Sequence, residues 1–232
     1  CWEFTLTFEL QKNGALRPYK GSPMNVESIE KDFRTLVEGE TDLLNLVVKL
    51  HFSIDKVLDK TLFEALPMAN VMELRRVSFL LKFDFLSALS VLSLDVRKFF
   101  DYCNSIRNTF AHNPYAIFSD KDVSKAKNLL LSHQCPVVPK SFRTEKNSVE
   151  VLKTLFTVCF LQVVVSYEDL CRKKVLNLIT SEMTFEAAVG KERRFQGKKS
   201  VHEEFEHRCV ERLGVLYPAI ESGDYYKKAI FK

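Results

Sequence analysis

Apolar residues recur every three or four positions along most of this chain, the spacing that places them on one face of an α-helix. The first such series consists of Val26, Ile29, Phe33, Leu36 and Val37. Residues 42–58 continue the spacing with a larger apolar share, which is typical of a helix at the centre of a bundle. Only 7 glycines and 7 prolines occur in 232 residues, against 19 phenylalanines, so a turn-dense all-β fold is disfavoured.

The same spacing predicts the remaining helices. Two apolar helical segments a turn apart are expected over 71–81 and 83–92, followed by a helix over 94–112. This last helix ends before Pro114, because a proline disfavours helical backbone in the residue that precedes it. A polar connector then leads to a long helix over roughly 149–179. The predicted fold class is mainly α, a bundle of four to five core helices.

The amino-terminal segment differs from the rest of the chain. Residues 4–10 alternate apolar and polar side chains, and Asn13-Gly14 supplies a turn signal, so the pattern is compatible with a short strand or β-hairpin. The chain is therefore divided into an amino-terminal extension, a helical bundle and a charged, basic carboxy-terminal extension. Their expected limits are 1–24, 25–180 and 181–232.

Charge narrows the class of partner only slightly. The 34 Lys and Arg residues exceed the 30 Asp and Glu residues to give a net charge of +4, which is less than a dedicated binder of duplex DNA would carry. Six cysteines occur without a C-x-x-C pair, so we expect reduced, mostly buried thiols and a cytoplasmic location. The longest apolar run, residues 155–165, is shorter than the roughly 20 residues of a membrane span, and no membrane partner is expected.

Functional side chains gather at only one helix end, in the sequence from Asn104 to Pro114. Asn108 and His112 lie four residues apart on one helical face, and the long Arg107 side chain can reach the same volume. An imidazole can accept or donate a proton at neutral pH, and a guanidinium can grip phosphate oxygens as negative charge builds on them. Since the 2′-hydroxyl of RNA is an internal nucleophile, these groups could promote phosphodiester cleavage without a metal ion or other cofactor.

Two readings of this helix end remain open. Arg107 and His112 could simply complement the partial negative charge at the carboxyl end of a helix, which is worth about 0.3–1 kcal/mol. Acid–base catalysis needs one group that removes a proton and another that supplies one, and one arginine with one histidine does not provide both. A catalytic reading therefore predicts a homodimer that brings two copies of the pair together across a two-fold axis.

The string Arg107-Asn108-Thr109-Phe110-Ala111-His112 resembles the R-x4-6-H motif of the HEPN superfamily, including the polar residue that follows the arginine. Residues 78–89, taken with residues 106–112, are similar to the helix pair of mannitol-repressor-like and related HEPN proteins. The resemblance covers 26–114, with the helix over 149–179 as a further member of the bundle.

This resemblance implies a HEPN-like bundle that dimerises to form one shared cleft. It implies a metal-independent endoribonuclease, a toxin or defence effector restrained by an antitoxin or regulatory protein, in which Arg107 and His112 are catalytic and Asn108 supports them. RNA would be the substrate. Other HEPN proteins keep the bundle without the activity, and the mannitol-repressor branch is associated with transcriptional control. The alternative is therefore a non-catalytic regulator or protein-interaction module.

Two other segments contain residues of the kinds that bind RNA or metal ions. A basic run could follow an RNA backbone or could be an ordinary solvated loop; its residues are Lys191, Arg193, Arg194, Lys198 and Lys199. His202 and His207 lie five residues apart and do not match the H-E-x-x-H zinc arrangement, so no metal site is predicted. His51 has no evident partner in the sequence, and no role is assigned to it.

Overall fold

The computed structural model describes residues 26–67, 69, 73–113, 115–132, 138, 140–189, 200–223, 225 and 226. This part of the chain contains seven α-helices, which confirms the predicted mainly α class. The expected strand or hairpin within residues 1–24 lies outside the described residues. The helices are α1 (Val26–Gly39), α2 (Leu43–Ala65), α3 (Phe79–Ala88), α4 (Arg97–His112), α5 (Asp120–Ser132), α6 (Ser148–Ala188) and α7 (Val201–Leu216).

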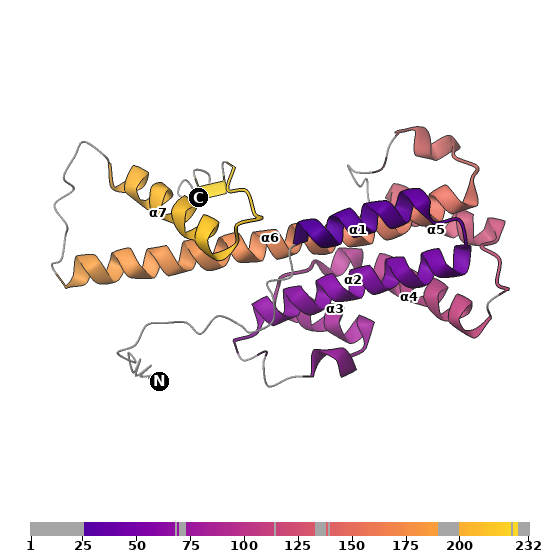
Figure 1. Ribbon diagram of the computed structural model, residues 1–232, viewed down its shortest axis with the longest axis horizontal. Coiled ribbons are helices and arrows are strands. Elements are labelled where there is room, and N and C mark those ends of the chain that lie inside the picture. Colours follow the sequence, from indigo (N-terminus) through magenta and orange to yellow (C-terminus); the bar gives the residue numbers. More distant parts are fainter. Residues whose placement is uncertain are drawn as a thin grey trace.

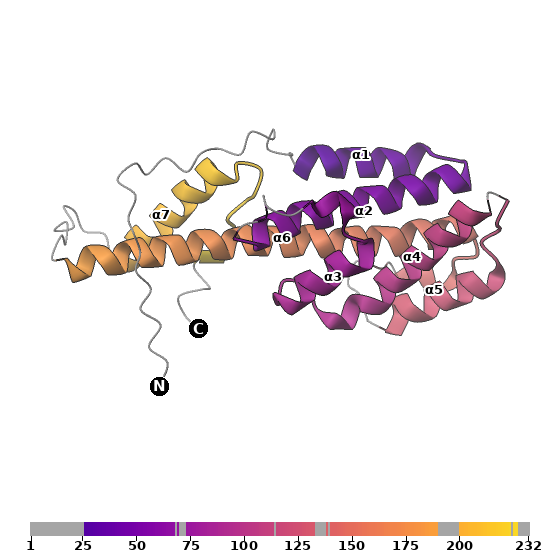
Figure 2. The same cartoon turned by 90° about the horizontal axis from the view of Figure 1, so that it is seen from below.

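Helix α6 forms the long axis of the molecule (Figure 1). Its 41 residues span about 60 Å at 1.5 Å per residue. The bundle of α1 to α5 surrounds its amino-terminal half, and α7 packs against its carboxy-terminal half, as the perpendicular view also shows (Figure 2). Helix α2 packs directly on α6 and also contacts α1, α3 and α4, so α2 and α6 together form the centre of the bundle.

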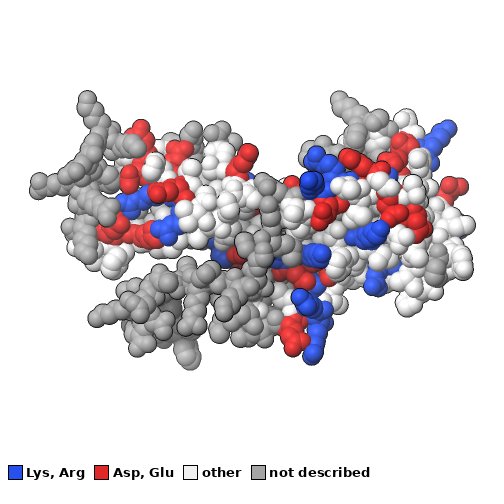
Figure 3. Space-filling model, viewed as in Figure 1, with Lys and Arg blue, Asp and Glu red and all other residues white. Residues whose placement is uncertain are grey.

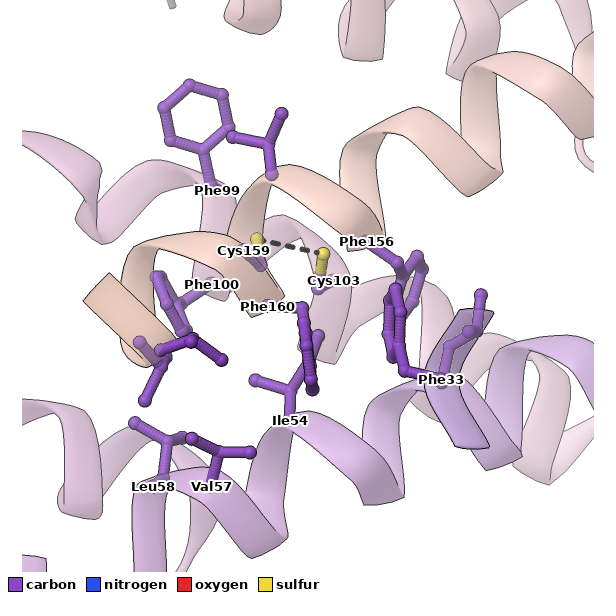
Figure 4. Close-up of a cluster of buried hydrophobic side chains, with 14 of the residues drawn as sticks. Phe33, Ile54, Val57, Leu58, Phe99, Phe100, Cys103, Phe156, Cys159 and Phe160 are labelled. Carbon is purple, nitrogen blue, oxygen red and sulfur yellow. Dashed lines mark hydrogen bonds between the residues drawn. The ribbon is translucent and has the colours of Figure 1, made fainter. Parts of the chain in front are cut away.

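Aromatic side chains and thiols fill the contact between α6 and its neighbours (Figure 4). The ring of Phe33 stacks on that of Phe160 with centroids 4.0 Å apart. The Sγ atoms of Cys103 on α4 and Cys159 on α6 lie 3.4 Å apart as a hydrogen-bonded thiol pair. Burial raises the pKa of the Cys103 thiol, so it behaves as a small core side chain and not as a nucleophile.

The apolar character of α6 also meets the length and composition criteria for a membrane span. An 18-residue stretch within it has a mean hydropathy of 1.8, and half of that stretch is buried inside the structure. The core helix of a soluble protein passes the same test, so this is weak evidence for a membrane. The expectation of a chain without a membrane partner stays a prediction.

The two helices expected over 71–81 and 83–92 are not present in that form. A single helix, α3, begins at Phe79, because the Ser78 hydroxyl accepts a hydrogen bond from the Leu81 amide (3.4 Å) and caps the helix there. It ends at Ala88, and Ser90 takes a left-handed backbone conformation with φ of 57°. The predicted boundary was wrong because apolar spacing alone cannot reveal where a serine caps a helix.

Helix α5 lies in a segment that the sequence predicts to be a polar connector. Its amino terminus is held by Ser119 and Asp122: the Ser119 amide donates to Asp122 Oδ2 (3.0 Å), and the Asp122 amide donates to Ser119 Oγ (3.4 Å). Ala126 and Leu130 are its buried residues, and it packs on α6. Val123, Leu129 and Leu131 are partly buried beside them, and the sequence prediction omits this helix because charged residues dominate its amino-terminal half.

Helix α6 runs nine residues beyond the predicted end at 179, through the expected domain limit at 180. Helix α7 begins with a capping box, in which the Glu203 amide donates to Ser200 Oγ and the Ser200 amide donates to Glu203 Oε2. It buries Cys209 and Leu213 against α6. Part of the expected carboxy-terminal extension is therefore packed on the long helix.

Candidate functional site

The predicted motif lies on the last two turns of α4. This helix is continuous from Arg97 to His112 and ends where the Asn113 amide donates to the Thr109 carbonyl (2.9 Å). Ile106 and Phe110 are buried and anchor this end to the core. Arg107 and His112 are exposed, and Asn108 is half-buried, so all three motif residues lie along the outer edge of a rigid helix.

The geometry within one chain separates the guanidinium from the imidazole. Arg107 donates from Nη1 to Asn108 Oδ1 over 3.1 Å, which ties the two side chains together. Arg107 and His112 are five residues apart on a continuous helix, so they point about 140° apart around its axis and lie about 7.5 Å apart along it. Asn108 and His112, four residues apart, share one side.

The structure brings a second imidazole close to Arg107. The ring of His51 on α2 packs at a tilt against that of Phe79 on α3, with centroids 4.1 Å apart, and the Phe79 ring lies 6.0 Å from that of Phe100 on α4. Arg107 follows Phe100 by seven residues, two helical turns, and so lies on the same side of α4. The sequence analysis gives His51 no role. The one feature that could have drawn attention to it is that a histidine occupies a position among the apolar, buried residues of α2.

Burial keeps the His51 imidazole neutral. Loss of solvent is the main cause that lowers the pKa of His51. The positive charges of Arg107 and Lys82 add to the shift, while Asp55 and a hydrogen bond with Asn104 oppose it, and the resulting pKa is about 4. Its side chain is only 9% exposed. A group with so low a pKa and so little access cannot donate a proton to RNA at neutral pH.

The low pKa of His51 predicts loss of stability in mild acid. Between pH 6.5 and pH 4 the unfolded chain binds a proton at this residue and the folded protein does not, so the free energy of unfolding falls as pH falls. The loss should approach about 3 kcal/mol near pH 4. Urea unfolding of the wild type and of His51→Phe should reveal it as a stability difference that changes by this amount between pH 7 and pH 4 and stays level above pH 7. A constant difference would contradict it.

A buried ion cluster lies beside His51. The Lys82 ammonium of α3 is 1% exposed, donates a hydrogen bond to Asp55 Oδ1 (2.8 Å) and pairs with Asp59 Oδ1 (2.8 Å). Desolvation raises the pKa of Asp59, although Lys82 opposes that shift. Asp55 and Asp59 follow His51 at four and eight residues along α2, so the three polar side chains form one stripe on a largely apolar helix.

Exposed apolar side chains flank the motif. Tyr115 and Ile117, three and five residues after His112, are 91% and 82% exposed. Val48, three residues before His51 and on the same side of α2, is also exposed.

The basic run is outside the described residues, and His202 and His207 lie on α7, which packs on the far half of α6. Acidic and basic side chains are intermixed on the face drawn in Figure 3. Within the described ranges, no group of three His, Cys, Asp or Glu side chains could hold a metal ion. Metal-independent chemistry remains a prediction.

Comparison of the chain with protein-family models, with curated proteins and with solved structures finds no match.

Proposed function

We propose that this protein is a metal-independent endoribonuclease of the HEPN type, whose active site is formed by Arg107, Asn108 and His112 of two protomers. The observation that carries the proposal is that these three side chains lie on the last two turns of one rigid helix, where Arg107 and His112 are exposed and Arg107 donates a hydrogen bond to Asn108. The resemblance of the same string to the R-x4-6-H motif supports it.

Each side chain has a role in this chemistry. His112 takes the proton of an RNA 2′-hydroxyl, whose oxygen attacks the neighbouring phosphorus and displaces the 5′-oxygen of the next nucleotide. Arg107 binds the phosphate oxygens as their negative charge grows, and Asn108 holds the guanidinium in orientation. The products are a 2′,3′-cyclic phosphate and a 5′-hydroxyl, the latter formed when an acid protonates the leaving oxygen.

A second protomer supplies that acid. His51, the one other imidazole beside the motif in the described chain, is buried and has a pKa of about 4. The exposed side chains of Tyr115 and Ile117, which follow the motif directly along the chain, offer apolar area for the dimer contact. A facing His112 would complete the acid–base pair and lie within reach of the same phosphate.

Cleavage of an RNA pool by purified dimeric protein tests the function directly. The expected result is cleavage that EDTA leaves unchanged and that leaves cyclic phosphate ends, because the mechanism uses only side chains. Loss of cleavage with EDTA and its return with a divalent cation would overturn the metal-independent mechanism. Absence of cleavage by a protein that is dimeric would overturn the ribonuclease itself.

Mixed dimers test whether the site is shared. When wild type is co-expressed with an equal amount of His112→Ala, random pairing leaves about a quarter of the dimers with two histidines. If both are required, cleavage falls to about a quarter of the wild-type value; if each protomer acts alone, it falls to about half. The dimer content of both samples is checked by light scattering, and a value near one half would exclude the composite site.

The alternative is a non-catalytic regulator or interaction module, and one feature of α4 favours it. Among the described residues of one chain, His112 is the one accessible imidazole near Arg107, and Arg107 already has a partner in Asn108. In that case Arg107→Ala and His112→Ala would leave growth of the expressing cells unchanged, whereas a ribonuclease toxin arrests growth and both substitutions relieve the arrest. Restraint by an antitoxin would be expected only if the protein is a ribonuclease toxin.

A further inference from the structure

We propose that a carboxy-terminal arm, formed by α7 and the residues after it, is attached to the bundle at Glu64 and opens as one unit to uncover an apolar stripe of α6. The arm comprises residues 201–223, 225 and 226 among those that the structure describes. It lies beside the half of α6 that extends beyond the bundle (Figures 1 and 2). The proposal concerns this end of the molecule and does not depend on the ribonuclease activity.

Few contacts hold α7 itself in place. Among the described elements, α7 packs extensively on α6 alone, and two of its 16 residues are buried. Two ion pairs join the helices: Arg208 to Glu186 (3.1 Å) and Arg212 to Glu182 (3.3 Å). The glutamate side chains are 37% and 36% exposed, so water screens both pairs. A segment with so few buried contacts opens at a lower free energy than the core of a domain.

Glu64, near the end of α2, is the bundle residue that bonds to the arm. Its Oε2 atom accepts one hydrogen bond from the Tyr217 hydroxyl (3.2 Å) and another from Lys174 Nζ of α6 (2.9 Å). The Lys174 ammonium also donates to the Glu64 carbonyl (3.0 Å). The Glu64 side chain is only 16% exposed, so these bonds are better shielded from water than the two ion pairs of α7. One carboxylate therefore joins the end of α2, the middle of α6 and the end of α7.

Arg172 of α6 holds the residues that follow Tyr217. Its Nε donates to the Glu221 carbonyl (3.0 Å), and its guanidinium lies 5.9 Å from the centroid of the Tyr225 ring. The Arg172 carbonyl accepts from the hydroxyl of Tyr226, whose side chain is 1% exposed. A turn in which the amide of residue 220 donates to the Tyr217 carbonyl (2.9 Å) connects this tail to the end of α7. The tail and α7 are therefore parts of one unit.

The arm covers an apolar stripe on α6. Cys171, Val175 and Ile179 follow one another at four residues, lie on one side of the helix and are at most 1% exposed. Ile179 borders the same hollow as Arg208 and Arg212 of α7. Opening of the arm brings this stripe into water, which costs free energy in proportion to the apolar area exposed. The closed arm is therefore the predominant state, and the open one is a minor state.

Native cysteines report the opening. Cys171 and Cys209, the arm cysteines, belong to the covered stripe of α6 and to the buried side of α7, whereas Cys103 and Cys159, the bundle cysteines, lie between α4 and α6. Burial raises the pKa of both arm cysteines to about 12, so they react with an alkylating reagent only when uncovered.

Alkylation of the full chain tests the single unit. The protein is treated with iodoacetamide, and the rate at each cysteine is followed by peptide mass spectrometry and divided by its rate in the urea-unfolded chain. The two arm cysteines should then show one common rate, faster than that of the bundle cysteines, because one opening exposes both. Different rates at the two arm cysteines, or rates no faster than in the bundle, would overturn the proposal.

Two substitutions test the attachment at Glu64. Glu64→Ala removes both bonds to the carboxylate and should speed alkylation of the arm cysteines by about tenfold, while Tyr217→Phe removes one of them and should speed it by about threefold. The bundle cysteines should keep their rates in both variants. In the double variant, Tyr217→Phe should add no further acceleration to Glu64→Ala, because its acceptor is already gone.

Glu150→Ala is the matched control. Glu150 also pairs with a lysine of α6, Lys153 (3.3 Å), but it lies at the amino-terminal end of that helix and its side chain is 50% exposed. This variant should leave every cysteine at its wild-type rate. Unchanged rates at the arm cysteines in Glu64→Ala would overturn the attachment, and so would equal acceleration at the bundle cysteines, which would report general loosening. Full additivity of Glu64→Ala and Tyr217→Phe would also overturn it, because the two residues would then not act through one bond.

Discussion

Replacing His112 with alanine is expected to slow RNA cleavage by about 10²–10⁴-fold, the usual contribution of a general acid or base. The effect should be large because, among the described residues, no other accessible imidazole lies beside Arg107, and the dimer loses both of its histidines at once. The rate of product formation from a labelled RNA, measured at saturating substrate, gives the value.

The fold of this variant should be preserved. His112 is an exposed residue at the last position of α4, where a cation is worth about 0.3–1 kcal/mol at most, so the midpoint of urea unfolding should barely move. His207→Ala, at an exposed histidine of α7, is the matched control and should cut RNA as well as the wild type. Equal cleavage by His112→Ala and wild type would remove His112 from the active site.

Replacing Lys82 with alanine is expected to lower the free energy of unfolding by about 3–5 kcal/mol, the range measured when one partner of a buried ion pair is removed. The ammonium is 1% exposed and lies 2.8 Å from a carboxylate oxygen of each of Asp55 and Asp59. Its loss leaves two partly buried negative charges without a counter-ion. Urea or thermal unfolding at neutral pH measures the change.

A second lysine provides the comparison. Lys98 on α4 is exposed, so Lys98→Ala should change the free energy of unfolding by no more than about 0.5 kcal/mol. Adding Asp55→Asn and Asp59→Asn to Lys82→Ala should recover part of the lost stability, because the uncompensated charges are then gone. A small effect of Lys82→Ala, within 1 kcal/mol of the Lys98 control by the same scale, would show that this ion cluster contributes little to stability.

The helices that could be predicted are those with strong local signals. The start of α2 follows from Asp42, whose Oδ2 accepts from the Asn45 amide (3.2 Å), ahead of a long apolar series. The end of α4 follows from the proline after Asn113. Helix α5 is absent from the prediction although Val123, Ala126 and Leu130 recur at three and four residues, because charged residues dominate its amino-terminal half.

The residues of the candidate site also divide into those that the sequence could predict and those that it could not. Arg107, Asn108 and His112 could be selected from one short string, since their spacing on a helix places them at an exposed end. His51 and Lys82 could not, because each has an ordinary reading in its own segment: a polar residue in an apolar helix, and a lysine in a phenylalanine-rich one. Only the packing of α2, α3 and α4 brings His51 within electrostatic range of both Lys82 and Arg107.

The amino-acid sequence by itself determined the helical class, the course of the longest helices and the polar string at the end of α4, because helix spacing and caps act over a few residues. The tertiary structure alone decided which helices meet, and with that the burial of His51 and the pairing of Lys82 with two carboxylates. The physical reason is that burial and electrostatic interactions depend on distance in space, and His51 comes within electrostatic range of Lys82 and Arg107 only when three helices pack together.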